Sequence, residues 1–227
     1  MVASPLPHDP SRRRAPDERP RQILDAALEV FAEQGLAGAR LDDIARRAGI
    51  AKGTIYLYFP NKEELFREVV RRTIGDRVKS ASDAIANLPA EASPESRLRL
   101  FAKEWWAFLR TSEYQTVYRL VLGELHRFPE LLAFYAEEAV VPARRLLSGL
   151  IASGTDAGTF RDVDAEVAAR CMASMFTTHA IWVSQKEARR ALGDRCDADA
   201  VFEQLYDFAI HALRPDVASA GAGASNA

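Results

Sequence analysis

The side chains of this sequence that are best suited to chemistry gather in one short segment. Lys52, Thr54, Tyr56, Tyr58 and Lys62 place ammonium groups, hydroxyls and flat rings between positions 52 and 62. Ammonium and hydroxyl groups donate hydrogen bonds to phosphate oxygens, and side chains of these kinds also read the edges of bases. Such a segment suits contact with a nucleic acid, with ordinary packing as the alternative for the two tyrosines.

Signatures of catalysis are missing from the sequence. It has no Gly-rich phosphate loop, no zinc-spaced set of cysteines and histidines, and no nucleophile elbow. Glu124 and His126 lie two positions apart, so they cannot share a helix face, and the other histidines are scattered. We therefore expect a protein that is not an enzyme and that has neither a cofactor nor a metal site.

The composition is ordinary for a globular protein, because 48% of its 227 residues are hydrophobic and 27% are charged. No run approaches the roughly 18 consecutive apolar residues of a membrane helix. The arginines near the N-terminus are not followed by the apolar run of a secretory signal. Cys171 and Cys196 are too few for a disulfide framework. These features predict a cytoplasmic protein with no membrane partner.

Charge alone does not identify a nucleic-acid partner. The formal net charge is −2, although residues 1–90 carry 15 Lys+Arg against 13 Asp+Glu. A basic N-terminal end on an acidic body suits a small DNA-reading module joined to a second part. Arginine-rich tails are often only solubilising, however, so the residue pattern must decide.

Helical periodicity runs through nearly all of the chain, and strand signals are missing. The pattern predicts helices at 21–34, 41–48 and 52–58, a long one from Asn61, and five more at 94–111, 113–127, 129–153, 163–192 and 198–213. Pro142 should kink or split the helix that contains it. The expected fold is all-α, with about nine helices in total.

The two short helices are joined by a turn that contains Gly49, which is the arrangement of a helix-turn-helix. Residues 44–62 read IARRAGIAKGTIYLYFPNK, and residues 23–35 read ILDAALEVFAEQG. Both segments resemble the tetracycline-repressor (TetR) family of transcriptional regulators. The resemblance implies a helix-turn-helix at 41–59 within a DNA-binding domain at 18–78.

The same resemblance assigns roles to individual side chains. It implies that Lys52, Gly53 and Thr54 lie at the major groove of DNA, while Tyr56 and Lys62 hold phosphates. The expected DNA-binding set is Arg40, Lys52, Gly53, Thr54, Tyr56, Tyr58 and Lys62.

Three positions depart from the family pattern. Arg40 and Ala51 stand where the family usually has a hydroxyl that caps a helix, a contact worth about 1 kcal/mol. Tyr58 stands where the family commonly has His, and Arg40 could contact a phosphate instead of capping. The departures leave the operator sequence open. Arg46 and Arg47 are expected to form a solvated face.

The remainder of the chain resembles the AefR-like C-terminal subgroup of the family through residues 118–130 (YRLVLGELHRFPE) and 158–164 (GTFRDVD). This resemblance implies an effector-binding and dimerisation domain at 79–214. Composition predicts a disordered basic tail at 1–17, before the DNA-binding domain, and a flexible tail at 215–227, after the C-terminal domain.

Two groups of residues in this domain are expected to form sites, although a plain intramolecular core is the alternative for each. A small-molecule pocket is expected at Trp105, Phe108, Tyr118, His126, Phe134, Phe176 and His179. A homodimer interface is expected at Val167, Cys171, Met175, Trp182, Phe202, Leu205 and Phe208.

These expectations imply a dimeric repressor that leaves a palindromic double-stranded DNA operator when an unknown small-molecule effector binds. A second hypothesis, with which Arg40 and Ala51 agree, is a binding module whose DNA head is vestigial. A helical enzyme is a third hypothesis, and no group of residues supports it.

Overall fold

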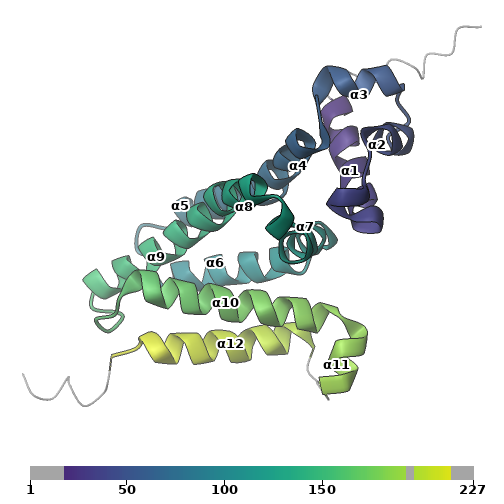
Figure 1. Cartoon of the computed structure of the whole chain (residues 1–227). Coiled ribbons are helices and arrows are strands. Elements are labelled where there is room, and N and C mark those ends of the chain that lie inside the picture. The colour runs from purple at the N-terminus through teal and green to yellow at the C-terminus, as the bar shows by residue number, and fades with distance from the viewer. Residues whose placement is uncertain (1–17, 193–196, 216–227) are drawn as a thin grey trace, which may run out of the picture. The chain divides into compact units, whose positions relative to one another are not determined.

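The computed structural model describes residues 18–192 and 197–215. Within these ranges all regular structure is helical (Figure 1), which confirms the predicted all-α fold. The predicted tails, apart from residue 215, and Cys196 lie outside the described residues. The chain divides into two compact units after Val69.

The first unit contains α1 (Glu18–Gly38), α2 (Leu41–Arg47), α3 (Lys52–Tyr58) and most of α4 (Lys62–Val70). Ile23, Ala27 and Phe31 recur at every fourth position of α1 and are fully or almost fully buried. The Phe31 ring meets the edge of Phe66 from α4 at 6.1 Å between centroids. Gly35 leaves helical geometry at φ 70°, so the regular part of α1 ends where the sequence predicts.

The turn between α2 and α3 depends on Gly49. Its φ of 67° lies in the left-handed region, where a side chain would be strained. The Gly49 N–H donates to the Arg46 carbonyl at 3.2 Å, and the Ile50 N–H donates to the Ala45 carbonyl at 3.0 Å. These bonds satisfy carbonyls at the end of α2 and redirect the chain into α3.

The second unit begins with a π-helical turn at Arg71–Gly75. It continues with α5 (Asp76–Ala86), α6 (Pro94–Leu109), α7 (Ser112–Gly123), a 3-10 turn (Leu125–Arg127), α8 (Pro129–Tyr135), a second π turn (Ala136–Val140), α9 (Val141–Asp156), α10 (Ala165–Ser184), α11 (Lys186–Leu192) and α12 (Ala198–Leu213).

The described residues form twelve α-helices, and the backbone stays helical through the two π turns that join α4 to α5 and α8 to α9, so the number of continuous helices agrees with the predicted number of about nine. The segment predicted as 129–153 is α8, a π turn and α9, and Pro142 lies in the first turn of α9. The backbone is already helical at Val140 and Val141, so the π turn directly precedes the turn that contains this proline. Gln185 separates α10 from α11.

Helices α9 and α10 pack against each other in the second unit, and α10 runs beside α12 (Figure 1). An aromatic cluster fills the space between α6, α10 and α12. Trp106 lies with its ring 6.0 Å from Phe176 and 6.2 Å from Phe202, and its indole N–H donates to the Ala198 carbonyl at 3.1 Å.

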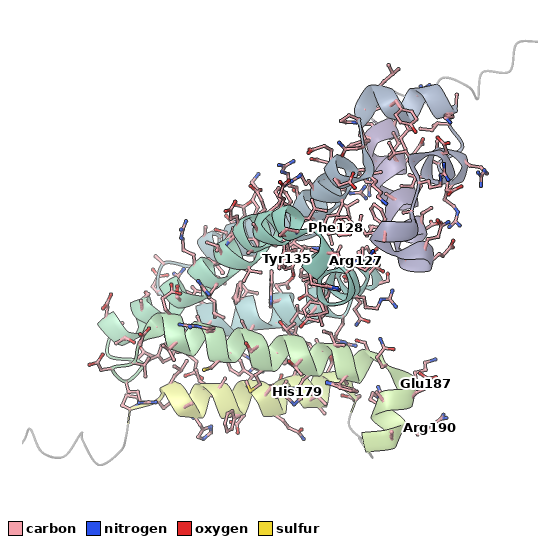
Figure 2. The ribbon with its side chains drawn as sticks, viewed as in Figure 1. Arg127, Phe128, Tyr135, His179, Glu187 and Arg190 are labelled. Carbon is pink, nitrogen blue, oxygen red and sulfur yellow. The ribbon has the colours of Figure 1, made fainter. Side chains whose placement is uncertain are left out.

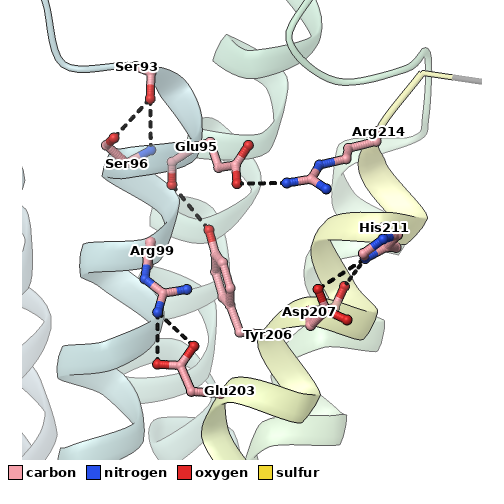
Figure 3. Close-up of polar contacts among 9 residues, drawn as sticks. All are labelled: Ser93, Glu95, Ser96, Arg99, Glu203, Tyr206, Asp207, His211 and Arg214. Atoms are coloured by element: carbon pink, nitrogen blue, oxygen red, sulfur yellow. Dashed lines mark hydrogen bonds and ion pairs between the residues drawn. The ribbon is translucent and has the colours of Figure 1, made fainter. Parts of the chain in front are cut away.

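Polar contacts also fasten α12 to the start of α6, as Figure 3 shows. The Arg99 guanidinium donates to both carboxylate oxygens of Glu203 at 2.7 and 2.6 Å. The Tyr206 hydroxyl donates to the Glu95 carbonyl at 3.1 Å, and Arg214 donates to the Glu95 carboxylate at 3.2 Å. The last helix is thus held along its length by the unit's own residues.

None of the helices formed by residues 18–192 and 197–215 combines the length and apolar character that crossing a membrane requires.

Candidate functional site

Helix α3 presents most of its surface outward. Ile55 is fully buried and attaches the helix to the first unit, whereas Tyr56, Leu57 and Tyr58 are 47%, 83% and 38% exposed. A Cβ added to Gly53 would meet open space, so the backbone itself is accessible there. A short helix with one buried anchor and a bare backbone position is suited to entering a groove.

Asp42 in the first turn of α2 holds two of the expected DNA contacts. Its Oδ2 lies 2.8 Å from the Lys52 ammonium, and its Oδ1 accepts a hydrogen bond from the Tyr56 hydroxyl at 3.2 Å. The hydrogen bond from Lys52, then charge attraction, holds the pKa of Asp42 below its ordinary value. One carboxylate therefore fixes both side chains of α3 relative to α2.

The two arginines at the end of α2 are occupied by carboxylates. Arg47 donates to Glu29 at 2.8 Å and to Glu33 at 2.7 and 3.0 Å, so it ties α2 to α1. These hydrogen bonds raise the pKa of Arg47, with Glu33 as the largest cause. Arg46 pairs with Asp43 at 2.9 Å and is largely exposed. Neither side chain is free to read bases in this state.

Lys62 and Asn61 organise the start of α4. The Lys62 ammonium donates to the carbonyls of Ala37 at 2.8 Å and Ala39 at 3.3 Å, which secures the loop between α1 and α2. The Asn61 Oδ1 accepts from the Glu64 N–H at 2.7 Å and caps the helix, whose start lies where the sequence predicts. Arg40 and Ala51 precede α2 and α3 without a side-chain cap, in agreement with the sequence.

The second unit contains a partly open cavity of about 150 Å³ between the two π turns, α6, α7, α8, α9 and α10. Tyr114 and Tyr135 form its buried side, and Figure 2 labels Tyr135 on α8. Thr177 also lines the cavity, and the polar side chains of Tyr135 and Thr177 both influence the pKa of Tyr114. Burial raises the pKa of Tyr135 to about 12 and that of Tyr114 further, so both phenols are neutral at physiological pH.

The solvent side of this cavity is polar and basic. Arg144, Arg170 and Ser174 belong to its lining, and the last two are exposed. Arg144 pairs with Glu166 through Nε at 3.3 Å. Arg170 makes no ion pair with any residue that the structure describes. The cavity therefore has neutral hydroxyls at one side and a cationic opening at the other.

The residues expected to form an effector pocket lie at different places. Trp105 lines the cavity, and the Phe108 ring packs on the Trp105 ring with centroids 5.2 Å apart. Tyr118 stacks on Tyr114 at 5.7 Å. These rings support the cavity wall, but Phe108 and Tyr118 are not part of its lining.

The other four expected pocket residues lie away from the cavity lining. Phe134 is buried beneath the Arg71 guanidinium, and Phe176 belongs to the aromatic cluster around Trp106. His126 and His179 are exposed, and Figure 2 shows His179 on α10.

The expected pocket set omits the polar lining residues Arg144, Arg170, Ser174 and Thr177. A signal for three of them exists, because positions 170, 174 and 177 share one face of a helix.

A second concavity, of about 550 Å³, runs between α10 and α12 and includes Val167, Cys171, Met175 and Phe208 from the expected dimer interface. Val167 and Phe208 are 47% and 69% exposed, which is unusual for large apolar side chains.

The remaining expected interface residues differ in exposure. Trp182 is half exposed, Leu205 is partly buried, and Phe202 lies inside the unit's own aromatic cluster.

Comparison with known proteins agrees with both units. Residues 23–69 match the bacterial regulatory proteins of the tetR family, and residues 96–204 match the AefR-like transcriptional repressor C-terminal domain. The HTH-type transcriptional repressor KstR2 of Rhodococcus jostii is 29% identical over 86% of this chain and 91% of its own. The HTH-type transcriptional regulator BetI of Escherichia coli is 33% identical over 58% of this chain and 80% of its own.

Solved structures show the same fold. The regulator FadR from Bacillus subtilis, in complex with stearoyl-CoA, superposes with a TM-score of 0.68 at 21% identity, covering 86% of this chain and 99% of its own. A transcriptional regulator from Saccharomonospora viridis, in complex with choline, superposes with a TM-score of 0.68 at 27% identity. The match covers 88% of this chain and 100% of its own. The chain therefore belongs to the TetR family of bacterial regulatory proteins, and it is a DNA-binding transcriptional repressor with an AefR-like C-terminal domain and not an enzyme.

Proposed function

We propose that the chain acts as a homodimer that binds a palindromic operator and is released from it by a small molecule held in the second unit. The observation that carries this proposal is the coexistence, in the second unit, of an exposed apolar groove and a separate, partly open cavity. The first suits a second copy of the chain, and the second suits an effector.

In the proposed complex α3 enters the major groove, with its exposed surface toward the bases. The DNA-contacting residues would be Arg40, Lys52, Gly53, Thr54, Tyr56, Tyr58 and Lys62. Lys52 and Tyr56 would exchange Asp42 for phosphate or base acceptors. Lys62 would use its third N–H on a phosphate while keeping the two carbonyls that it already holds.

A dimer is supported by the groove between α10 and α12. Large apolar side chains such as Phe208 and Val167 are costly to leave in water, at about 25 cal/mol per Å². Burying them against the same surface of a second copy gives a closed two-fold assembly. Such a pair also supplies two α3 helices. A palindromic operator requires two, because its half-sites lie in successive major grooves about 34 Å apart.

An effector mechanism is supported by the cavity, whose walls come from helices on several sides. A ligand that fits better in one arrangement of these helices shifts the population toward that arrangement. The relatives agree with this type of control, since one solved structure holds stearoyl-CoA and another holds choline.

The test begins with the purified chain and a DNA fragment from its own promoter region. Retardation should saturate with two protomers per site, and the affinity should fall steeply as salt rises. Lys52→Ala and Tyr56→Ala should each weaken the shift, and the double variant should abolish it. Salt-insensitive binding, or regulation in cells that survives both substitutions, would instead support a vestigial DNA head.

A further inference from the structure

We propose that the 150 Å³ cavity of the second unit takes a compact anion, namely a carboxylic acid built on a single ring, and does not take a cation or a long acyl chain. This inference rests on the proposed function, since it names the class of effector for the cavity assigned above.

The volume limits the size of the ligand. An apolar cavity of about 150 Å³ holds one benzene ring, whereas drug-sized ligands need about 300 Å³ or more. The cavity of the second unit, at about 150 Å³, has the volume that holds one ring. A single ring with a small substituent fits it, and a long hydrocarbon chain does not.

The walls favour a flat ring. Phe101 and Trp105 lie nearly parallel, with an interplanar angle of 13° and centroids 5.7 Å apart, and both line the cavity. Ile74 and Leu147 contribute aliphatic surface. Aromatic and aliphatic walls of this kind bury a ring by offset stacking and by apolar contact.

Charge decides between an anion and a cation. An aromatic wall alone also attracts quaternary ammonium groups. The cavity lining, however, has Arg144 and Arg170 and no acidic side chain among its described members. Glu166 offsets the charge of Arg144, while Arg170 pairs with no described residue. An arginine without a partner binds a carboxylate with two parallel hydrogen bonds and repels a cation.

The spacing along α10 fits a ring that carries two polar ends. Arg170 and Thr177 are seven residues apart, which is about 10 Å along a helix. Thr177 lines the cavity together with Tyr114 and Tyr135, so hydroxyls are available at that end. A carboxylate at Arg170 and a ring hydroxyl at the tyrosine pair would span this distance with their hydrogen bonds. Ser174 lies between the two ends on the same face.

The experiment titrates the full-length protein with matched probes of one ring size by calorimetry. Benzoate and 4-hydroxybenzoate carry the anion, phenyltrimethylammonium carries a cation, and stearate tests chain length. We expect saturable binding of the two benzoates only. Arg170→Gln should weaken benzoate binding by about tenfold or more, as expected for loss of a charged hydrogen-bond pair. Arg145→Gln, an exposed arginine of α9 outside the lining, should bind like the parent protein.

Several outcomes overturn the inference. Two concern the probes: the ammonium probe binds more tightly than benzoate, or stearate binds as tightly as benzoate. A third is that benzoate does not bind at concentrations up to about 10 mM, which is beyond the weakest specific affinities. The fourth is that Arg170→Gln binds benzoate with the affinity of the parent protein. Far-ultraviolet circular dichroism of each variant checks that it is folded.

A parallel operator-binding assay separates this inference from the proposed function. If benzoates bind through Arg170 but leave operator binding unchanged, the ligand class stands and effector control fails. If another small molecule releases the operator while benzoates do not bind, effector control stands and the ligand class fails.

Discussion

The side-chain ammonium of Lys52 lies 2.8 Å from Oδ2 of Asp42, so the first residue of α3 is bound to the first turn of α2. The Tyr56 hydroxyl donates to the other oxygen of the same carboxylate. Both donors belong to the proposed DNA contacts. The carboxylate thus preorganises the two side chains and, at the same time, competes with the phosphates that they would bind.

Asp42→Asn should tighten operator binding several-fold at low salt, because it removes a competing negative charge from the interface. Lys52→Ala should weaken binding at all sequences and reduce the slope of log affinity against log salt by about 1. Fluorescence anisotropy of a labelled promoter fragment at several salt concentrations measures both effects. Lys79→Ala on α5 provides a control outside the first unit. Weaker binding by Asp42→Asn would show that positioning outweighs competition.

Gly53→Ala should separate stability from DNA binding. The added methyl meets open space in the free protein, and Ala is favoured over Gly in a helix, so the free energy of unfolding should rise by up to about 1 kcal/mol. Close approach of the α3 backbone to DNA should become impossible, so affinity should fall by about tenfold or more, about 1.4 kcal/mol.

Thermal unfolding measures the stability of the Gly53→Ala variant, and fluorescence anisotropy on the same sample measures its affinity for the operator. Gly149→Ala in α9, where a methyl also meets open space, should stabilise without affecting DNA binding. Unchanged operator affinity of Gly53→Ala would mean that this position does not face DNA.

The sequence predicts the first unit well because its signals are local. Gly35 and Gly49 both have φ near 70°, and both stand where the sequence places a helix end. The absent caps at Arg40 and Ala51 follow directly from residue type. Lys62 is different, because its binding to the Ala37 and Ala39 carbonyls depends on packing that brings distant segments together.

The cavity is harder to predict for the same reason. Aromatic residue type alone does not distinguish Trp105, which lines the cavity, from Phe176, which fills the core around Trp106. The difference depends on which helices neighbour each ring. Helical spacing puts Arg170 on one face with Ser174 and Thr177, but only the packing of α9 and α10 places that face at an opening.

Phe208→Glu combined with Val167→Glu should convert the proposed dimer into monomers. Both side chains are exposed in the groove between α10 and α12, and two charges there would be buried without partners in a two-fold interface. Sedimentation velocity measures the oligomeric state, and operator affinity should fall with the loss of the second α3. Leu122→Glu, on an equally exposed residue of α7, should remain dimeric. A dimeric double variant would place the interface elsewhere.

Alkaline pH should destabilise the second unit through its buried phenols. Burial, the largest cause, raises the pKa of Tyr206 to about 12, and burial also raises that of Tyr135 to about 12. An unfolded phenol ionises near pH 10. Between pH 10 and 12 the unfolded chain has therefore lost protons that the folded chain retains. The stability that these groups contribute is complete below pH 10 and is lost as the pH rises toward 12.

Tyr206→Phe should reduce the steepness of this loss, because one fewer phenol takes part. The variant also lacks the hydrogen bond to the Glu95 carbonyl, so its stability at neutral pH should fall by about 1 kcal/mol. Urea unfolding from pH 8 to 12 measures both quantities. A slope that Tyr206→Phe leaves unchanged would mean that Tyr206 ionises alike in the folded and unfolded chains.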